Sequence, residues 1–454
     1  MEAWKTISIS LGYLSILFVL AHLIDKNALK GKHFIKYKWI YALSVPVYCT
    51  AWTFYGSVGK AVNDGWEFLT IYIGPLLTMP LWWLIVRKLI RICETQRIST
   101  LPDLISSRHG NSVSISVLSS VLIILGIIPY ISIQFKSITS SFEILTYGSY
   151  QENNLSTIFL NDSAFYLFII LALFIILFVF KTIETTDKHY GMMGAIAIDS
   201  VLKLIAFLAV GIFVTYGLFN GFGDLFSKSS LRMSETFYQI PSDSGFDWFM
   251  LLLLSMSAIV LLPRQFQVTV AENTDEKHIK TVGWVFPLYL LLINIFVVPI
   301  ALAGKLMLPE AVNPDSYVLA IPMMSGNQAL ALLTFIGGFS AATGMVIVST
   351  TALSMISSNN IFVPLFLKQA DNKKIDSKLP LRSRRLAVFI ILFLAYLYYK
   401  FVADQFSIVS IGLISFAAMI QFVPSIMGAL YWRDGNKKGV IAGLLGGFII
   451  WGFT

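Results

Sequence analysis

Charged residues are scarce in this sequence, since Asp, Glu, Lys and Arg make up only 13% of its 454 residues. Globular proteins carry about 25%. Together with a hydrophobic share of 56%, this scarcity excludes a soluble enzyme, and it also excludes disordered, collagen-like and coiled-coil chains. Cysteine is rare as well: Cys49 and Cys93 cannot form a disulfide framework and indicate no redox compartment. The class that remains is a polytopic membrane protein.

Patterns typical of catalysis are also missing. The sequence has no phosphate-binding glycine loop and no nucleophile elbow. Its histidines have no metal-ligand spacing and are scattered over loop or interfacial positions: His22, His33, His109, His189 and His278. We therefore expect no enzyme activity and no organic cofactor in this chain.

Apolar runs, in contrast, fill most of the chain. Most of them are long enough for a helix to cross about 30 Å of hydrocarbon at about 1.5 Å per residue. Runs such as LFIILALFIILFVF are apolar on every side, which favours helices over the alternating strands of a barrel. The sequence thus predicts an all-α polytopic membrane protein with about 12 transmembrane helices. The runs cover residues 7–23, 39–58, 68–86, 113–142, 164–180, 192–219, 248–262, 282–302, 330–355, 386–398, 407–430 and 440–454.

Lysine and arginine concentrate in alternate connections between these runs. One set of connections holds 25 of the 33, including Arg264 just after the seventh run, whereas the other set and the N-terminus together hold six. Cytoplasmic connections carry the excess of positive charge, so this distribution predicts a protein of the cytoplasmic membrane with its N-terminus outside. The net charge of +8 therefore reflects membrane orientation and does not indicate nucleic-acid binding. The basic loop around residues 367–385 has a second interpretation, contact with anionic membrane lipid.

Two of the runs carry signs of interruption. Pro46 lies in the middle of the second run and removes a helical hydrogen bond. The seventh run is short, has Ser255 and Ser257 at its centre and ends at Pro263. Interrupted helices at corresponding positions of two halves are typical of transporter binding sites. Because the second and seventh runs are an odd number of crossings apart, the two halves are expected to have inverted topology, with breaks near Pro46 and near Ser255 to Ser257. The solute-binding residues that we expect are Tyr48, Thr53, Gln134, Ser255 and Ser257.

The ninth run offers a partner for the first interrupted helix. Its small residues at 337–344 permit close backbone approach, and Ser349, Thr350 and Thr351 follow with hydroxyl oxygens. Hydroxyls together with exposed carbonyls form a neutral oxygen shell that suits a sodium ion. The alternative is that these residues only hold helices together.

Three charged residues fall inside apolar runs: Lys136, Asp199 and Lys203. Asp199 and Lys203 are four residues apart on one helix face, in the order that favours an intrahelical pair. Charges inside a membrane are costly and usually either pair with each other or mark an ion or substrate path. For these residues, both interpretations remain open.

Four segments together are typical of one known family: ALSVPVYCTAWTFYGSVG, ISTLPDLISSRHG, LPRQFQVTVAENTDEKHIKTVGWVFPLYLLLINIFVVPIALAG and GGFSAATGMVIVSTTALS. They resemble the sodium/solute symporter family, most closely its branch in which the transporter domain precedes a sensor histidine kinase. The resemblance implies a LeuT-type fold of five plus five inverted helices behind one extra N-terminal helix. It divides the chain into residues 1–37 (extra helix and basic loop), 38–220 (first repeat), 246–432 (second repeat) and 438–454 (a further, possibly truncated, transmembrane helix).

The resemblance also implies a sodium site. Its ligands are the carbonyl oxygens of Pro46, Cys49 and Val346 and the hydroxyls of Ser349 and Thr350. Asp199 matches an acidic residue near the sodium path, whereas Lys203 departs from the family pattern and could replace or weaken ion coupling.

Two functions follow from the resemblance. The first is a sodium-coupled symporter that imports a small polar solute by alternating access. The second is the solute-sensing input domain of a truncated sensor histidine kinase, with a PAS and kinase module and a response regulator as partners. Sodium is the only cofactor expected in either case.

Overall fold

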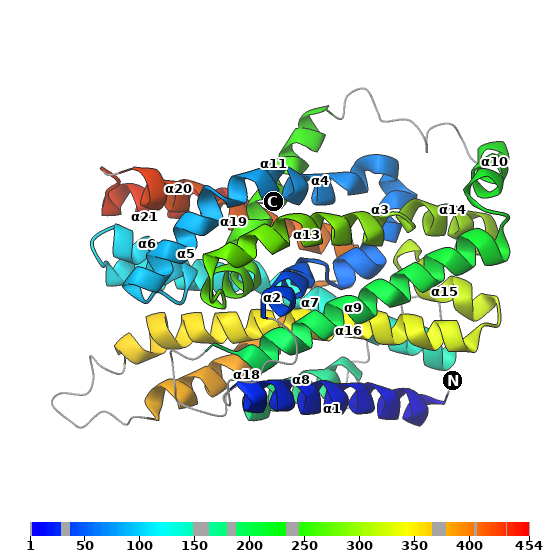
Figure 1. The fold of residues 1–454 in the computed structure, drawn as a ribbon, viewed down its shortest axis with the longest axis horizontal. Coiled ribbons are helices and arrows are strands. Elements are labelled where there is room, and N and C mark those ends of the chain that lie inside the picture. The colour runs from blue at the N-terminus through cyan, green and yellow to red at the C-terminus, as the bar shows by residue number, and fades with distance from the viewer. Residues whose placement is uncertain are drawn as a thin grey trace.

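The computed structural model describes residues 2–28, 37–148, 163–178, 188–232, 245–365, 378–403, 406–432 and 434–453, and these residues form helices and no strands (Figure 1). Most of the predicted basic loop, residues 366–377, lies outside the described residues. The first half contains α1 (Ala3–Ala28), α2 (Tyr37–Ser44), η1 (Val45–Tyr48), η2 (Trp52–Gly56), α3 (Ser57–Asp64), η3 (Gly65–Leu69), α4 (Thr70–Trp82), α5 (Ile85–Gln96), α6 (Leu101–Arg108), α7 (Val113–Tyr147), α8 (Ser163–Phe178), α9 (Tyr190–Ile212), η5 (Phe213–Leu218) and α10 (Phe222–Arg232). The second half contains α11 (Gly245–Leu261), α12 (Pro263–Phe266), η8 (Gln267–Ala271), η9 (Glu276–His278), α13 (Ile279–Asn294), α14 (Val297–Met307), η10 (Pro314–Ser316), α15 (Tyr317–Met324), α16 (Gln328–Ser357), η11 (Ser358–Phe362), α18 (Leu379–Phe401), α19 (Ile408–Ile420), α20 (Val423–Tyr431) and α21 (Lys437–Trp451).

Membrane-spanning length is reached by six helices of the described residues, or by eight spans if each of two bent helix pairs counts as one. Shorter apolar helices such as α8 fall below that length. The total of about 12 crossings therefore stays a prediction.

The long helix α16 lies at the centre of the bundle, and the long helices α7 and α9 both pack against it (Figure 1). Small residues on α16 allow this approach: a Cβ atom on Gly337 would lie 2.4 Å from the Cβ of Ala206, and one on Gly338 would lie 1.9 Å from the Tyr55 hydroxyl. The small residues of the ninth run thus serve close packing, as the sequence suggests.

The extra N-terminal helix, α1, lies along the outside of the bundle against α9 (Figure 1). Gly191 and Gly194 of α9 permit the contact, since a Cβ atom at either position would lie within 2.5 Å of α1 atoms. Large apolar side chains such as Ile16 and Val19 remain exposed on α1, as expected of a helix that faces lipid.

The first predicted break is present near Pro46. The helical path runs through α2 into the 3₁₀ turn η1, leaves helical geometry at Cys49 and Thr50, and resumes in η2. Pro46 occupies the start of η1. The chain therefore exposes backbone polar groups in the middle of the bundle.

The second break lies at Leu262, and its expected position at Ser255 to Ser257 is wrong. α11 runs unbroken to Leu261, and the two arms meet at an angle of 45°. The hydroxyls of Ser255 and Ser257 donate to carbonyls one turn back, which leaves a helix intact. The break follows from Pro263, because a proline disfavours helical geometry in the residue before it; Leu262 has φ −58° and ψ 130°.

Candidate functional site

The two breaks face each other inside the bundle and are joined directly. The Gln265 side-chain amide, just after the second break, donates to the Val45 carbonyl at 3.4 Å. The Tyr41 hydroxyl donates to the Thr269 carbonyl at 2.6 Å. The non-helical backbone of both arms is thereby gathered into one region.

Helix α7 stabilises the first break. The amide oxygen of Gln134 accepts a hydrogen bond from the backbone N–H of Ala51 at 3.3 Å, and its NH₂ group donates to the Tyr130 carbonyl. The Thr50 hydroxyl lies 3.1 Å from the Tyr130 hydroxyl and accepts from the Trp52 N–H. In this conformation Gln134, which we expect to bind solute, holds the broken backbone.

The other expected solute-binding residues divide into two groups. Tyr48 and Thr53 are buried beside the first break, with the Tyr48 hydroxyl donating to the Ile71 carbonyl at 3.0 Å. Ser255 instead donates to the Thr70 carbonyl, and so joins α11 to α4, while Ser257 bonds within its own helix. The structure does not bring the two serines to the breaks.

Lys203 supplies the charged contact at the first break. This buried side chain of α9 places its ammonium nitrogen 3.0 Å from the Pro46 carbonyl oxygen and 2.6 Å from that of Cys49. These are two of the oxygens that the family resemblance assigns to sodium. The ammonium thus donates to both carbonyls at the break, and that of Pro46 accepts the Cys49 N–H at 2.9 Å as well.

Two further expected sodium ligands, the hydroxyls of Ser349 and Thr350, are buried and have no hydrogen-bond partner among the described residues. The adjacent Thr351 donates to the Ile347 carbonyl at 2.6 Å, as helical threonines commonly do. Val346 lies in the middle of the same continuous helix. Unpartnered hydroxyls fit a cation site, but with Lys203 on the two carbonyls the full set of five oxygens does not fit a sodium ion.

Asp199 and Lys203 form no ion pair in the described structure, contrary to their favourable spacing. The Asp199 carboxylate accepts hydrogen bonds from the Tyr13 hydroxyl of α1 and from Ser340 of α16, the latter at 3.1 Å. The two side chains point to different partners because the break offers carbonyls to the ammonium and α1 offers a hydroxyl to the carboxylate. Lys136, the third intramembrane charge, donates to the carbonyls of Ala403 and Phe406, both at 3.1 Å, beyond the end of α18.

Arg264 is a site residue that sequence reasoning misses. Counting charges places it in a cytoplasmic connection, and this is wrong: its exposure is 1%, and it lies two residues beyond the second break. The guanidinium lies over the Tyr130 ring, 4.4 Å from the centroid, and none of its three nitrogens has a hydrogen-bond partner among the described residues. A charged residue directly after the helix-ending Pro263 was the available signal.

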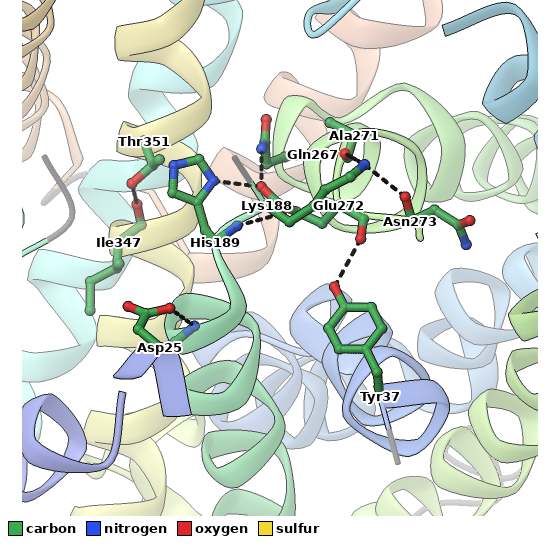
Figure 2. A network of polar contacts seen from close by, with 11 residues as sticks. Asp25, Tyr37, Lys188, His189, Gln267, Ala271, Glu272, Asn273, Ile347 and Thr351 are labelled. Carbon is green, nitrogen blue, oxygen red and sulfur yellow. Dashed lines mark hydrogen bonds and ion pairs between the residues drawn. The ribbon is translucent and has the colours of Figure 1, made fainter. Parts of the chain in front are cut away.

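A polar network joins the far end of the second broken helix to the start of α9 (Figure 2). We call it the Glu272 network. The Glu272 carboxylate accepts from the backbone N–H and the ring Nδ1 of His189 and from Gln267, at 2.7 to 2.8 Å. Tyr37 donates to the Glu272 carbonyl, and Lys188 donates to the carbonyls of Ala271 and Asn273 (Figure 2).

Glu272 and His189 lie just outside the membrane-spanning segments. Burial disfavours both charges, but their mutual attraction outweighs it. The pKa of His189 is therefore raised above its ordinary value, and the pKa of Glu272 is lowered. The pair joins the second broken helix to the start of α9, and its attraction requires both groups to be charged.

Comparisons with known proteins agree with this architecture. The uncharacterized symporter YodF of Bacillus subtilis (strain 168) is 23% identical over 412 residues, which cover 88% of this chain and 76% of that protein. The uncharacterized symporter YhjB of the same organism is 20% identical over 404 residues, with the same coverage.

The chain also shares its fold with a Na⁺-coupled sialic acid symporter, solved in a substrate-bound outward-open state. The TM-score is 0.65 at 14% identity, and the match covers 99% of this chain and 98% of that one. The expected fold class, a LeuT-type multi-pass membrane protein, is thereby confirmed. The family model described as "Sodium:solute symporter family" matches residues 37–447, so this chain belongs to the sodium:solute symporter family.

Proposed function

We propose that this protein is a secondary transporter that moves a small carboxylate-bearing solute across the cytoplasmic membrane by alternating access around the two helix breaks. Membership in a symporter family supports the transport of a small solute. The two joined breaks support a solute path between them, because non-helical backbone at membrane depth is tolerated where it lines a site for solute or ions.

The proposal that the solute bears a carboxylate rests on the unpaired guanidinium of Arg264. An unpaired charge buried away from water has a free-energy penalty of several kcal/mol, about 3 to 5 when a partner is removed. A guanidinium presents five N–H donors in a fork that matches a carboxylate bidentately. A solute carboxylate would supply Arg264 with the hydrogen-bond partner that the described residues do not provide.

The surrounding charges also favour an anion. Lys203 is the second buried cation near the first break, and its protein partners are neutral carbonyl oxygens. Asp199 is held by Tyr13 and Ser340 and makes no ion pair with either cation in the described structure. The region therefore has an excess of positive charge that a carboxylate would balance.

The Glu272 network supplies a closure for one end of this path. It ties the second broken helix to α9 through hydrogen bonds that must separate if that end opens. Lids and gates of this kind separate the two states of an alternating-access cycle. By the distribution of lysine and arginine, this end faces the cytoplasm.

Uptake into proteoliposomes tests the proposal. Short monocarboxylates, dicarboxylates and amino acids are assayed beside glucose and choline, each in NaCl and in choline chloride. We expect uptake of a carboxylate, no uptake of its amide analogue, and loss of uptake in Arg264→Gln. Arg108→Gln is the matched control, because Arg108 donates to the Ala429 carbonyl away from the breaks. Equal uptake of the acid and the amide, or full uptake by Arg264→Gln, would contradict the assignment.

The sensing function remains the alternative. A receptor with the same fold binds its solute and shifts between conformations without moving the solute across the membrane. Solute binding by the purified chain without uptake or counterflow would favour it.

A further inference from the structure

We infer that the ammonium group of Lys203 is the resident cation of the site that the family resemblance predicts for sodium, and that sodium does not bind at this site in the wild-type protein. The inference concerns the coupling site of the proposed transporter. It rests on that function only for its consequence, since its test measures sodium binding and not uptake.

The geometry places the ammonium where an ion would be held. Lys203 donates to the carbonyls of Pro46 and Cys49, at 3.0 and 2.6 Å, and all three residues are almost fully buried. Both carbonyls lie at the break between η1 and η2, and that of Pro46 also accepts the Cys49 N–H at 2.9 Å, which closes η1. A positive charge held by backbone carbonyls at a helix break is the arrangement that a coupling ion has in transporters of this kind. Here the positive charge is covalently attached to α9.

The charged groups around Lys203 do not alter this assignment. The Cys49 thiol, the Asp199 carboxylate and the Arg264 guanidinium are its charged or titratable neighbours. Asp199 accepts from Tyr13 and Ser340 and is not in hydrogen-bond contact with the ammonium. The ammonium is therefore held by neutral oxygens, as a sodium ion would be.

A sodium ion and the ammonium cannot share these carbonyls. Two unit charges about 4 Å apart in a partly buried site repel strongly enough to lower sodium affinity by about a thousandfold. Each carbonyl oxygen also already accepts a hydrogen bond from the ammonium, and that of Pro46 accepts a second one from the Cys49 N–H. The hydroxyls of Ser349 and Thr350 remain without partners in the described structure, and their helix, α16, packs against η1, which holds Pro46.

The consequence is a transporter whose uptake does not depend on sodium at this site. Removal of the Lys203 side chain should free the two carbonyls and create a sodium site together with Ser349 and Thr350. The change of one residue is then expected to convert a sodium-insensitive protein into a sodium-sensitive one.

A mutant cycle tests this directly. Four forms of the full chain are purified in detergent: wild type, Lys203→Ala, Ser349→Ala with Thr350→Ala, and the triple variant. The melting temperature of each is measured from 0 to 300 mM NaCl, with choline chloride holding ionic strength constant. A ligand that binds only the folded state raises the melting temperature as its concentration exceeds its Kd. The measured quantity is the rise in melting temperature with NaCl in a protein that has both hydroxyls, minus the rise in the matching protein that lacks them. We call this difference the hydroxyl-dependent response.

We expect this hydroxyl-dependent response to be zero in the wild-type background and clearly positive in the Lys203→Ala background. Lys136→Ala is the matched control, because it also removes a buried ammonium that donates to two carbonyls, and it should gain no sodium response. A hydroxyl-dependent response in wild type would overturn the inference, and so would its absence in folded Lys203→Ala.

If Lys203→Ala does not fold, ²²Na⁺ binding to wild type and to the double hydroxyl variant still decides. Binding that the double variant loses overturns the inference, and equal values in the two proteins support it. Both readouts are independent of solute transport. A failed uptake assay therefore speaks against the proposed function and leaves this result intact.

Discussion

Thr350→Val should stabilise the protein, whereas Thr351→Val should destabilise it. The two threonines are neighbours on α16, and both are fully buried. Their hydroxyls differ: that of Thr351 donates to the Ile347 carbonyl at 2.6 Å, and that of Thr350 has no partner among the described residues. Valine has nearly the same shape as threonine and is also β-branched, so the comparison isolates the hydroxyl group.

The magnitudes follow from the hydrogen bonds. A buried hydroxyl without a partner is destabilising by about 1 to 3 kcal/mol, which Thr350→Val removes. The Thr351 hydrogen bond contributes about 1 kcal/mol, which Thr351→Val loses. The two variants should therefore differ in their free energy of unfolding by about 2 to 4 kcal/mol, although they change adjacent residues of one helix in the same way.

Unfolding by denaturant in mixed micelles, without sodium or solute, measures both free energies. The same unfolding measurements in NaCl show whether sodium interacts with the Thr350 hydroxyl. If Thr350→Val destabilises the protein as much as Thr351→Val does, the Thr350 hydroxyl has a partner. That result would contradict the inference that this hydroxyl belongs to a cation site without a bound sodium ion.

Three further predictions concern other parts of the site. Tyr13→Phe removes a hydrogen bond to the buried Asp199 carboxylate and should lower stability by about 1.5 to 3 kcal/mol; an unchanged thermal melt would show that α1 is not held there. Gln134→Leu leaves a backbone N–H of the first break without its partner and should reduce uptake far more than folded yield; equal losses of both would indicate a packing role only. The ion pair of His189 and Glu272 should make stability greatest between pH 4.5 and 6.5, the ordinary pKa values of the two groups. Stability should fall as pH rises through the raised pKa of His189 or drops through the lowered pKa of Glu272, and a pH profile unchanged by Glu272→Gln would contradict this.

A proline marks each of the two breaks, although proline alone does not predict a break, since Pro129 lies inside the continuous helix α7. Pro46 marks the first one correctly, because proline acts on its own backbone and on the residue before it. The second break was expected at Ser255 and Ser257, but a serine hydroxyl can bond back to its own helix. The signal that mattered there was Pro263.

Side-chain direction was the part that the sequence could not provide. Asp199 and Lys203 have the spacing of an ion pair, yet each forms its hydrogen bonds with segments that are distant in sequence. Arg264 looks like one more charge in a connection and becomes a buried cation only because the second broken helix turns it inward. Gln134 is expected to bind solute, and only the position of α7 shows that it holds backbone.

A cryo-EM map of the full chain, prepared in NaCl with the carboxylate solute that uptake identifies, tests the central claim most directly. We predict solute density between the two breaks, with the carboxylate within hydrogen-bond distance of the Arg264 guanidinium. The claim would be contradicted by a solute that lies elsewhere, or by an Arg264 side chain that pairs with a protein carboxylate while the solute is bound.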